Sequence, residues 1–265
     1  MDTQLTQPVA DLIHDVARRI VMPRFRQLDA AEIEEKAPDE LVTVADRQSE
    51  DALTEGLMRL LPGSRVIGEE ACAVNPGLLD TVADGTVWIV DPIDGTANFA
   101  AGETPFGIMV ALVDRGVTQG AWILDPVADR MCHATLGGGA FINGERVRSR
   151  TSGQAIPVAG LSTRYLPPDL RDDMEARAVG KLQCVNIPRC AAEQYPRVIL
   201  GTNDLALFWR TFVWDHAPGA LILTEAGGRI ARFDGTPYAP AQSGTGMLAA
   251  ATPGMWDRTA EILLR

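Results

Sequence analysis

The sequence is poor in the residues that build zinc sites, disulfide frameworks and membrane spans. Its 265 residues include four cysteines, none of them in a CxxC pair, and three histidines. This usage argues against zinc fingers and disulfide-stabilised folds, and it is typical of a reducing cytoplasm. No stretch stays apolar for the roughly 18 residues that a membrane helix needs, and the N-terminal region lacks the pattern of a signal peptide. We therefore expect a soluble, unprocessed cytoplasmic protein with no membrane partner.

Positive charge is also scarce. The chain has 24 Lys and Arg residues against 35 Asp and Glu residues, which gives a formal net charge of -11. Such a surface repels phosphodiester backbones, so nucleic acid is not expected as a partner and hydrolysis of nucleic acid is disfavoured. Any phosphate that binds must be met by local groups. With 46% hydrophobic and 22% charged residues, the chain can bury a sizeable core.

Helical and strand patterns alternate along the chain, which predicts an α/β or α+β class of layered sheets and helices. Helices are expected at about 9–28, 46–61, 168–181, 191–200, 215–226 and 255–264, and short strands at 41–44, 65–68, 87–90, 107–113, 120–124, 205–208 and 247–250. In this interpretation Asp46 is the N-cap of the second helix. The glycines near 137–144 favour hairpin turns over a nucleotide loop, because no GxGxxG spacing leads from a strand into a helix.

Two segments differ from these periodic stretches. Residues 29–40 are acidic, lack apolar periodicity and contain Pro38, so they predict a mobile loop that carries Lys36. Residues 148–157 are polar enough to join two lobes, and no internal repeat or proline-rich linker divides the chain elsewhere. We expect one domain over residues 1–265, with two lobes that meet near 148–157.

The segment 88–99 carries the strongest chemical signal. An apolar strand ends at Asp91 and is followed at once by Pro92-Ile93-Asp94-Gly95-Thr96, so the two carboxylates converge at the strand end. Hard oxygen ligands of this kind suit Mg²⁺. If Thr96 begins a helix, the free amides of Gly95 and Thr96 point at a phosphate, aided by the helix dipole. Read alone, the acid pair is equally typical of an ordinary turn and cap.

Two further acids add to this interpretation. Glu69 ends another short strand, and Asp215 opens a helix, although a solvated turn and a plain N-cap are the simpler interpretations of each. Carboxylates held close together repel one another by about 3 kcal/mol per pair at a separation of roughly 5 Å and an effective dielectric constant near 20. Bound cations remove that penalty. Such a site is expected to bind metal more tightly as the pH rises, because protons and metal compete.

In their order along the chain, these motifs resemble the inositol monophosphatase family of Mg²⁺-dependent, lithium-sensitive phosphatases. The resemblance covers nearly the whole chain and rests on residues 41–46, Gly68-Glu69-Glu70, residues 91–96 with Asn98-Phe99, and Trp214-Asp215 followed by residues 225–228. It implies an αβαβα sandwich of the sugar-phosphatase type, usually assembled as a homodimer. It also implies hydrolysis of a small phosphate monoester, such as an inositol, sugar or related metabolite phosphate.

The resemblance assigns a role to each of these positions. It implies two or three Mg²⁺ ions, the first held by Glu69, Asp91 and the Ile93 carbonyl, the second by Asp91, Asp94 and Asp215, and a weaker third that leans on Glu69. A metal-activated water, oriented by Glu69 and Thr96 with Asp46 behind Thr96, then attacks phosphorus in line. The amides of Gly95 and Thr96 hold the phosphoryl oxygens. Lys36 approaches the metal site.

The substrate side departs from the family pattern. Phe208 stands where inositol-hydrolysing members have an acidic residue that hydrogen-bonds the ring, and Arg189-Cys190-Ala191 replaces a run of small residues. Because polar contacts of this kind set specificity, these departures weaken the case for inositol as the substrate. Arg189 is either a contact for a second anionic group or a surface ion-pair partner. Trp209 either lines the pocket or fills the core, and packing roles are expected for His216 and Cys190.

Several functions remain open at this point. Relatives that act on sugar bisphosphates, 3′-phosphoadenosine 5′-phosphate or histidinol phosphate are alternatives to an inositol phosphatase. A non-catalytic protein that only binds a phosphorylated metabolite is the alternative from another class. The presence of Glu69, Asp46 and Thr96, which mere binding does not require, favours catalysis.

Overall fold

The computed structural model describes residues 3–37 and 40–265 and contains two large β-sheets. The larger, seven-stranded sheet has the order β3 (Arg65–Gly68), β4 (Thr86–Asp94), β5 (Gly107–Asp114), β6 (Val117–Asp125), β7 (Arg130–Thr135), β8 (Gly139–Ile142) and β9 (Glu145–Val147). In this sheet β3 is parallel to β4, and every other neighbouring pair is antiparallel. The smaller, five-stranded sheet has the order β11 (Gln183–Cys184), β10 (Val158–Leu161), β12 (Leu205–Phe208), β14 (Met247–Ala250) and β13 (Arg229–Arg232). Here β10 is parallel to β11 and to β12, while β14 is antiparallel to β12 and to β13.

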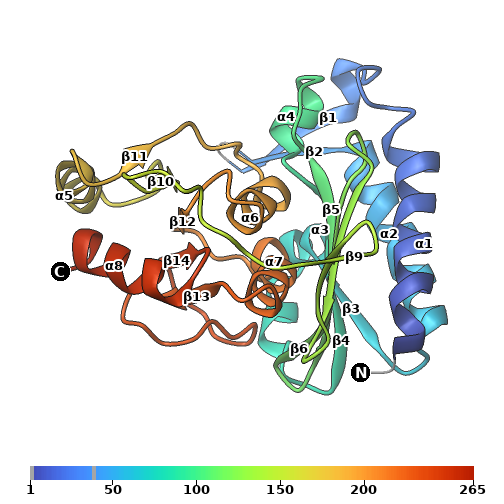
Figure 1. Ribbon diagram of the computed structural model, residues 1–265. Helices are drawn as coiled ribbons and strands as arrows, with labels where there is room; N and C mark the ends of the chain where they lie inside the picture. Colours follow the sequence, from blue (N-terminus) through green and yellow to red (C-terminus); the bar gives the residue numbers. More distant parts are fainter. Residues whose placement is uncertain (1–2, 38–39) are drawn as a thin grey trace.

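The helices form three layers around these sheets, as Figure 1 shows. The α-helices are α1 (Thr6–Val16), α2 (Val44–Leu60), α3 (Glu69–Val74), α4 (Thr96–Ala100), α5 (Pro168–Ala178), α6 (Ala191–Ile199), α7 (Val213–Glu225) and α8 (Pro253–Leu263). Helices α1 and α2 cover the outer face of the larger sheet, α6 and α7 lie between the sheets, and α5 and α8 cover the far face of the smaller sheet. The predicted αβαβα sandwich is therefore confirmed.

Apolar side chains fill each of the spaces between these layers. One buried cluster joins α1 and α2 to the larger sheet, a second lies between the two sheets around α6 and α7, and a third joins the smaller sheet to α5 and α8. Strand β4 is buried along almost its whole length, which explains its continuous apolar run. Burial on both faces fixes the register of β4 and therefore the place where its acidic end emerges.

The segment 29–40 differs from its prediction. Within the described residues it contains a short 3-10 turn, Ala30–Glu32, and the strand β1 (Ile33–Ala37), which pairs antiparallel with β2 (Glu40–Thr43). The prediction of a loop here is therefore wrong, and Lys36 lies on a strand. Backbone pairing with β2 holds β1 although its side chains show no apolar alternation. Pro38, which also motivated the loop, lies outside the described residues.

Three helix boundaries also differ from the sequence interpretation. The helix predicted at about 9–28 ends as α1 at Val16 and continues as a wider π-type turn only to Val21. Helix α2 has Thr43 as its N-cap, and Asp46 is its third residue. The two form a capping box, in which the side chain of each accepts a hydrogen bond from the backbone N–H of the other. Asp215 is likewise the third residue of α7, not the first.

The proposed junction at residues 148–157 lies in the connection from β9 in the larger sheet to β10 in the smaller one. The division of the chain into two lobes of one domain stays a prediction. In the described part of the chain, no helix combines the length and apolar character needed to cross a membrane.

Candidate active site

The end of β4 places two carboxylates at one edge of the larger sheet. The Asp91 side chain accepts a hydrogen bond from the backbone N–H of Ile93 at 3.0 Å, and the residue is 1% exposed. The pairing between β4 and β5 shifts register between Asp91 and Asp94. This irregularity interrupts the alternation of a regular strand and re-aims the second side chain, so Asp94 also lines the pocket.

Gly95 makes the turn that follows. Its φ is 85°, in the left-handed region, and it is the N-cap of α4, which begins at Thr96 as the sequence suggested. A Cβ atom at this position would lie 3.1 Å from the Pro105 carbonyl oxygen and 3.2 Å from the Cβ of Cys190. Both the backbone conformation and the lack of space therefore require glycine here.

We expect Gly95→Ala to lower the free energy of unfolding by about 1–3 kcal/mol, the usual cost of a strained left-handed residue plus close contact. Urea denaturation measures this change. Gly63→Ala is the matched control, because Gly63 has a φ of 88° and open space around its Cβ position. The difference between the two variants isolates the cost of contact; equal losses would contradict the close packing inferred at Gly95.

Thr96 connects this turn to α2. Its hydroxyl lies 2.9 Å from the Ile93 carbonyl oxygen and 3.2 Å from Oδ1 of Asp46, to either of which it can donate. The other oxygen of Asp46 accepts hydrogen bonds from the N–H and hydroxyl of Thr43. Burial raises the pKa of Asp46 to about 6, although the bonds from Thr43 oppose the shift. The predicted pairing of Thr96 with Asp46 is thus present in the structure.

Asp215 completes an acidic cluster from the first turn of α7. Carboxylate oxygens of Asp91, Asp94 and Asp215 all lie within 4.8 Å of one another. Burial and the charges of neighbouring carboxylates raise the pKa values of Asp91 and Asp215 well above their usual range. Burial also raises the pKa of Asp94 to about 6, against hydrogen bonds led by the one from the Ala192 N–H. Three acids this close, one of them buried and two partly buried, need a cation for full ionisation.

Glu69 faces the same pocket but is paired with Lys36. The Lys36 ammonium lies 2.6 Å from Glu69 and 2.7 Å from Glu70. Burial raises the pKa of Glu69 to about 7, although the Lys36 charge opposes the shift. For Lys36, burial acts to lower the pKa, but the charges and hydrogen bonds of Glu69 and Glu70 outweigh it and raise the value. Behind them Glu50 accepts the N–H groups of Glu70 and Ala71, which fixes the start of α3.

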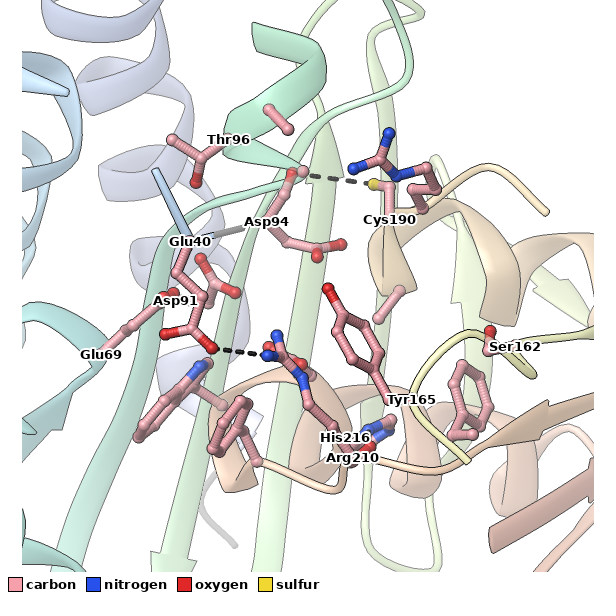
Figure 2. A pocket seen from close by; sticks show the side chains of 18 of the residues that line it. Glu40, Glu69, Asp91, Asp94, Thr96, Ser162, Tyr165, Cys190, Arg210 and His216 are labelled. Atoms are coloured by element: carbon pink, nitrogen blue, oxygen red, sulfur yellow. Dashed lines mark hydrogen bonds and ion pairs between the residues drawn. The ribbon is translucent and has the colours of Figure 1, made fainter. Parts of the chain in front are cut away.

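These residues surround a cavity of about 770 Å³. Its wall contains Lys36, Glu69, Asp91, Ile93, Asp94, Gly95, Thr96, Arg189, Phe208 and Asp215, so every predicted site residue except Asp46 lines it. Asp46 lies just behind, in contact with Thr96. Figure 2 shows Glu69, Asp91, Asp94 and Thr96 gathered around the pocket.

The structure adds pocket residues that the sequence interpretation missed. Glu40 and Arg210 form an ion pair, and the Arg210 guanidinium lies over the rings of Tyr165 and Phe212. None of these residues belongs to a recognisable motif. A single arginine among aromatic residues close before Asp215 is the only local signal that was present.

The residues expected to have packing roles are buried. The two ring nitrogens of His216 contact the Tyr195 hydroxyl at 2.9 Å and the Arg210 carbonyl oxygen at 3.0 Å. Burial raises the pKa of the Cys190 thiol well above its usual range, which opposes formation of a reactive thiolate. Trp209 is half-buried and lines the cavity.

Comparisons with known proteins identify the family of this chain. The sequence profile of the inositol monophosphatase family matches residues 2–264. The Nus factor SuhB of Pseudomonas aeruginosa is 30% identical over 87% of this chain and 87% of its own, and the inositol-1-monophosphatase of Bacillus subtilis is 28% identical over 89% and 88%. The solved structure of an inositol monophosphatase from Thermotoga maritima superposes with a TM-score of 0.81, at 24% identity over 100% of this chain and 97% of that one, and supports the fold.

The chain therefore belongs to the inositol monophosphatase family. It is a phosphoric monoester hydrolase, an enzyme that acts on small phosphate monoesters. The acidic cluster of Asp91, Asp94 and Asp215 can hold a metal ion in its pocket.

Proposed function

We propose that the protein hydrolyses a small phosphorylated metabolite in an Mg²⁺-dependent reaction that uses water as the nucleophile. The observation that carries this proposal is that the Asp91, Asp94 and Asp215 carboxylates meet the Thr96 hydroxyl in one pocket, while Asp46 contacts Thr96 from behind the pocket wall. The three carboxylates suit a hard divalent cation, and the pair of Thr96 and Asp46 suits the orientation of a water molecule.

The donor set fits Mg²⁺. The three clustered residues are all aspartates, so they offer only carboxylate oxygens as ligands. The pKa values of Asp91 and Asp215 are raised, and a bound divalent cation would lower them again. In our proposal Asp91, Asp94 and Asp215 hold one ion, while Glu69, Asp91 and the Ile93 carbonyl hold another, with a third, weaker ion near Glu69. When bound, Mg²⁺ lowers the pKa of water and stabilises the oxygen that leaves.

The residues of the chain then position the reacting groups. The Thr96 hydroxyl donates a hydrogen bond to Asp46 or to the Ile93 carbonyl, so its lone pairs are directed to accept a hydrogen bond from the attacking water. Glu69 offers a second acceptor for that water. The amides of Gly95 and Thr96, at the start of α4, hold the phosphoryl oxygens. The ammonium of Lys36 orients Glu69 and favours its charged form, against the effect of burial.

The identity of the alcohol is not fixed by this machinery. Inositol and sugar phosphates, 3′-phosphoadenosine 5′-phosphate and histidinol phosphate remain candidates, and Phe208 offers no acceptor for a polyol hydroxyl. We further propose a cytoplasmic homodimer that acts without nucleic acid. The Pseudomonas aeruginosa relative is named a Nus factor, which describes that protein alone.

We expect Mg²⁺-dependent release of phosphate from at least one compound in a panel of inositol, sugar, nucleotide and histidinol monophosphates. Colorimetric measurement of phosphate, with and without Mg²⁺, provides the assay.

Lithium is expected to reduce the rate of phosphate release by competition at the second metal position. Tight binding of a phosphate ester with no turnover at any Mg²⁺ concentration would instead support a protein that only binds the metabolite.

A further inference from the structure

Arg210 occupies a constrained position in the pocket wall, between β12 and α7. The carbon of its guanidinium lies 4.3 Å from the centre of the Tyr165 ring and 5.0 Å from the centre of the Phe212 ring. Phe212 in turn stacks on Trp214, with ring centroids 5.1 Å apart. Cations over aromatic faces are attracted to them, and the flat guanidinium also stacks well. The side chain is therefore held in place by its neighbours.

The backbone of Arg210 is fixed by a buried chain of hydrogen bonds. Nε2 of His216 lies 3.0 Å from the Arg210 carbonyl oxygen, which can only accept, so Nε2 is the donor in this hydrogen bond. Nδ1 of the same ring lies 2.9 Å from the Tyr195 hydroxyl. Arg210 is thus anchored to α6 and α7.

The charge of Arg210 is met across the pocket by Glu40. Nη1 of Arg210 donates to Oε1 of Glu40 at 2.5 Å, between residues 170 positions apart in the sequence. Figure 2 shows this ion pair as a dashed line between β2 and the segment that precedes α7. Among the residues that the structure describes, only Nη1 of this side chain has a hydrogen-bond partner, although the guanidinium also has donors at Nε and Nη2.

The surroundings of Arg210 favour an anion over a neutral polyol. Phe208, which also lines the cavity, stacks on Tyr195 with ring centroids 5.3 Å apart and presents no hydrogen-bonding group. Lys36, Arg189 and Arg210 all line the same cavity of a chain whose net charge is -11. Lys36 forms ion pairs with both Glu69 and Glu70, whereas Arg210 forms an ion pair with the partly exposed carboxylate of Glu40. The charge of Arg210 also acts to lower the pKa of Asp215, which burial raises.

We propose that Arg210 is a specificity-determining residue, which binds a second anionic group, a carboxylate or a phosphate, on the alcohol portion of the phosphate ester. In the free protein Glu40 accepts a hydrogen bond from Nη1 of Arg210, and the anion of the substrate replaces Glu40. This inference rests on the proposed phosphatase function and names its substrate class. A planar, rigidly held guanidinium binds carboxylates and phosphates through paired hydrogen bonds.

The test uses pairs of substrates that differ only in the second anion. Glycerol 3-phosphate and 3-phosphoglycerate differ by a carboxylate, and adenosine 3′-phosphate and adenosine 3′,5′-bisphosphate differ by a phosphate. We expect kcat/KM to favour the member with the extra anion in at least one pair. Which pair shows the preference distinguishes the carboxylate from the phosphate. Arg210→Gln is expected to reduce that preference about 10- to 100-fold, mainly through KM, the usual effect of losing a charged hydrogen bond.

Matched variants separate recognition from general disturbance. Arg229 lies over the Trp256 ring at 3.9 Å and pairs with Asp257, so Arg229→Gln removes an equivalent arginine outside the pocket and is expected to leave the preference intact. Glu40→Gln, which weakens the competing carboxylate, is expected to increase the preference. Glu34→Gln removes a different ion pair of the β1–β2 hairpin, with Arg47, and serves as its control.

Binding of the same pairs is also measured by calorimetry, with Ca²⁺ in place of Mg²⁺. If no compound releases phosphate, the proposed function fails, and the binding preference still decides the role of Arg210. Equal binding and equal turnover of both members of each pair would overturn the inference. A preference that survives in Arg210→Gln, or that Arg229→Gln reduces to the same extent, would overturn it as well.

Discussion

Replacing Asp91 by Asn is expected to lower Mg²⁺-dependent turnover on the order of 10³-fold, comparable to the loss of other groups that stabilise charge in a transition state. Asp91 is central because its carboxylate lies within 4.8 Å of both Asp94 and Asp215 and is shared by both proposed metal positions. The amide keeps an acceptor for the Ile93 N–H, so the β4 turn is preserved. Steady-state phosphate release measures the loss, and undiminished turnover would contradict the proposed site.

The same substitution is expected to stabilise the metal-free protein. Asn removes one of three clustered acids, which when ionised repel one another by about 3 kcal/mol per pair at roughly 5 Å and an effective dielectric constant near 20. Thermal unfolding without Mg²⁺ measures this gain as a higher Tm, while the additional stabilisation by Mg²⁺ becomes smaller. A lower Tm in the metal-free variant would contradict the repulsion inferred from the raised pKa values.

Asp114→Asn provides the matched control for Asp91→Asn. Asp114 also ends a strand, β5, but hydrogen bonds from Thr86 and Arg115 lower its pKa. Its charge is therefore favoured in the folded state, so its removal is expected to lower stability slightly and to leave turnover unchanged. Opposite signs of the Tm change at two strand-end aspartates would separate the effect of the acidic cluster from that of a generic Asp→Asn change.

The convergence of the acidic residues could be predicted, because each of them lies at the end of a strand or in the first turn of a helix that has a strong sequence pattern. Strands β3, β12 and β14 have the bounds that their short apolar runs predicted. The strand run into Asp91 and the glycine after Asp94 likewise specify the turn of β4 into α4. The interval from Thr43 to Asp46 has the spacing of a capping box, with Asp in place of the usual Glu or Gln, and could have corrected the N-cap assignment.

Other features depend on contacts between segments far apart in the chain. Strand β1 carries no apolar alternation, and it forms because its backbone pairs with β2. That pairing brings Lys36 to Glu69, a contact that no local pattern encodes. The Glu40–Arg210 ion pair joins the first sixth of the chain to its last quarter. Such pairs are set by the tertiary arrangement of the sheets, so a single sequence gives no direct signal for them.

Mg²⁺ is expected to stabilise the protein much more at pH 8 than at pH 5.5. In the metal-free protein the pKa values of Asp46 and Asp94 are about 6 and that of Glu69 is about 7, all raised first by burial. These groups hold protons in the folded state at pH values where the unfolded chain has released them. Their contribution to stability is therefore lost as the pH rises from about 4 towards 7. Mg²⁺ replaces the protons of Asp94 and Glu69, the proposed ligands among these groups, so its apparent dissociation constant should fall as the pH rises, by up to about tenfold per pH unit for each proton released.

Thermal unfolding with and without Mg²⁺ across pH 5.5 to 8 measures this dependence, and calorimetry gives the dissociation constant. His216 acts in the opposite direction, because burial lowers its pKa to about 4 and its contribution to stability grows as the pH rises towards 6.5. The difference between the two conditions at each pH cancels this contribution. In Asp94→Asn one titrating ligand is lost, so the pH slope of the dissociation constant should become shallower. A shift in Tm on adding Mg²⁺ that is independent of pH would mean that protons and the ion do not share these carboxylates.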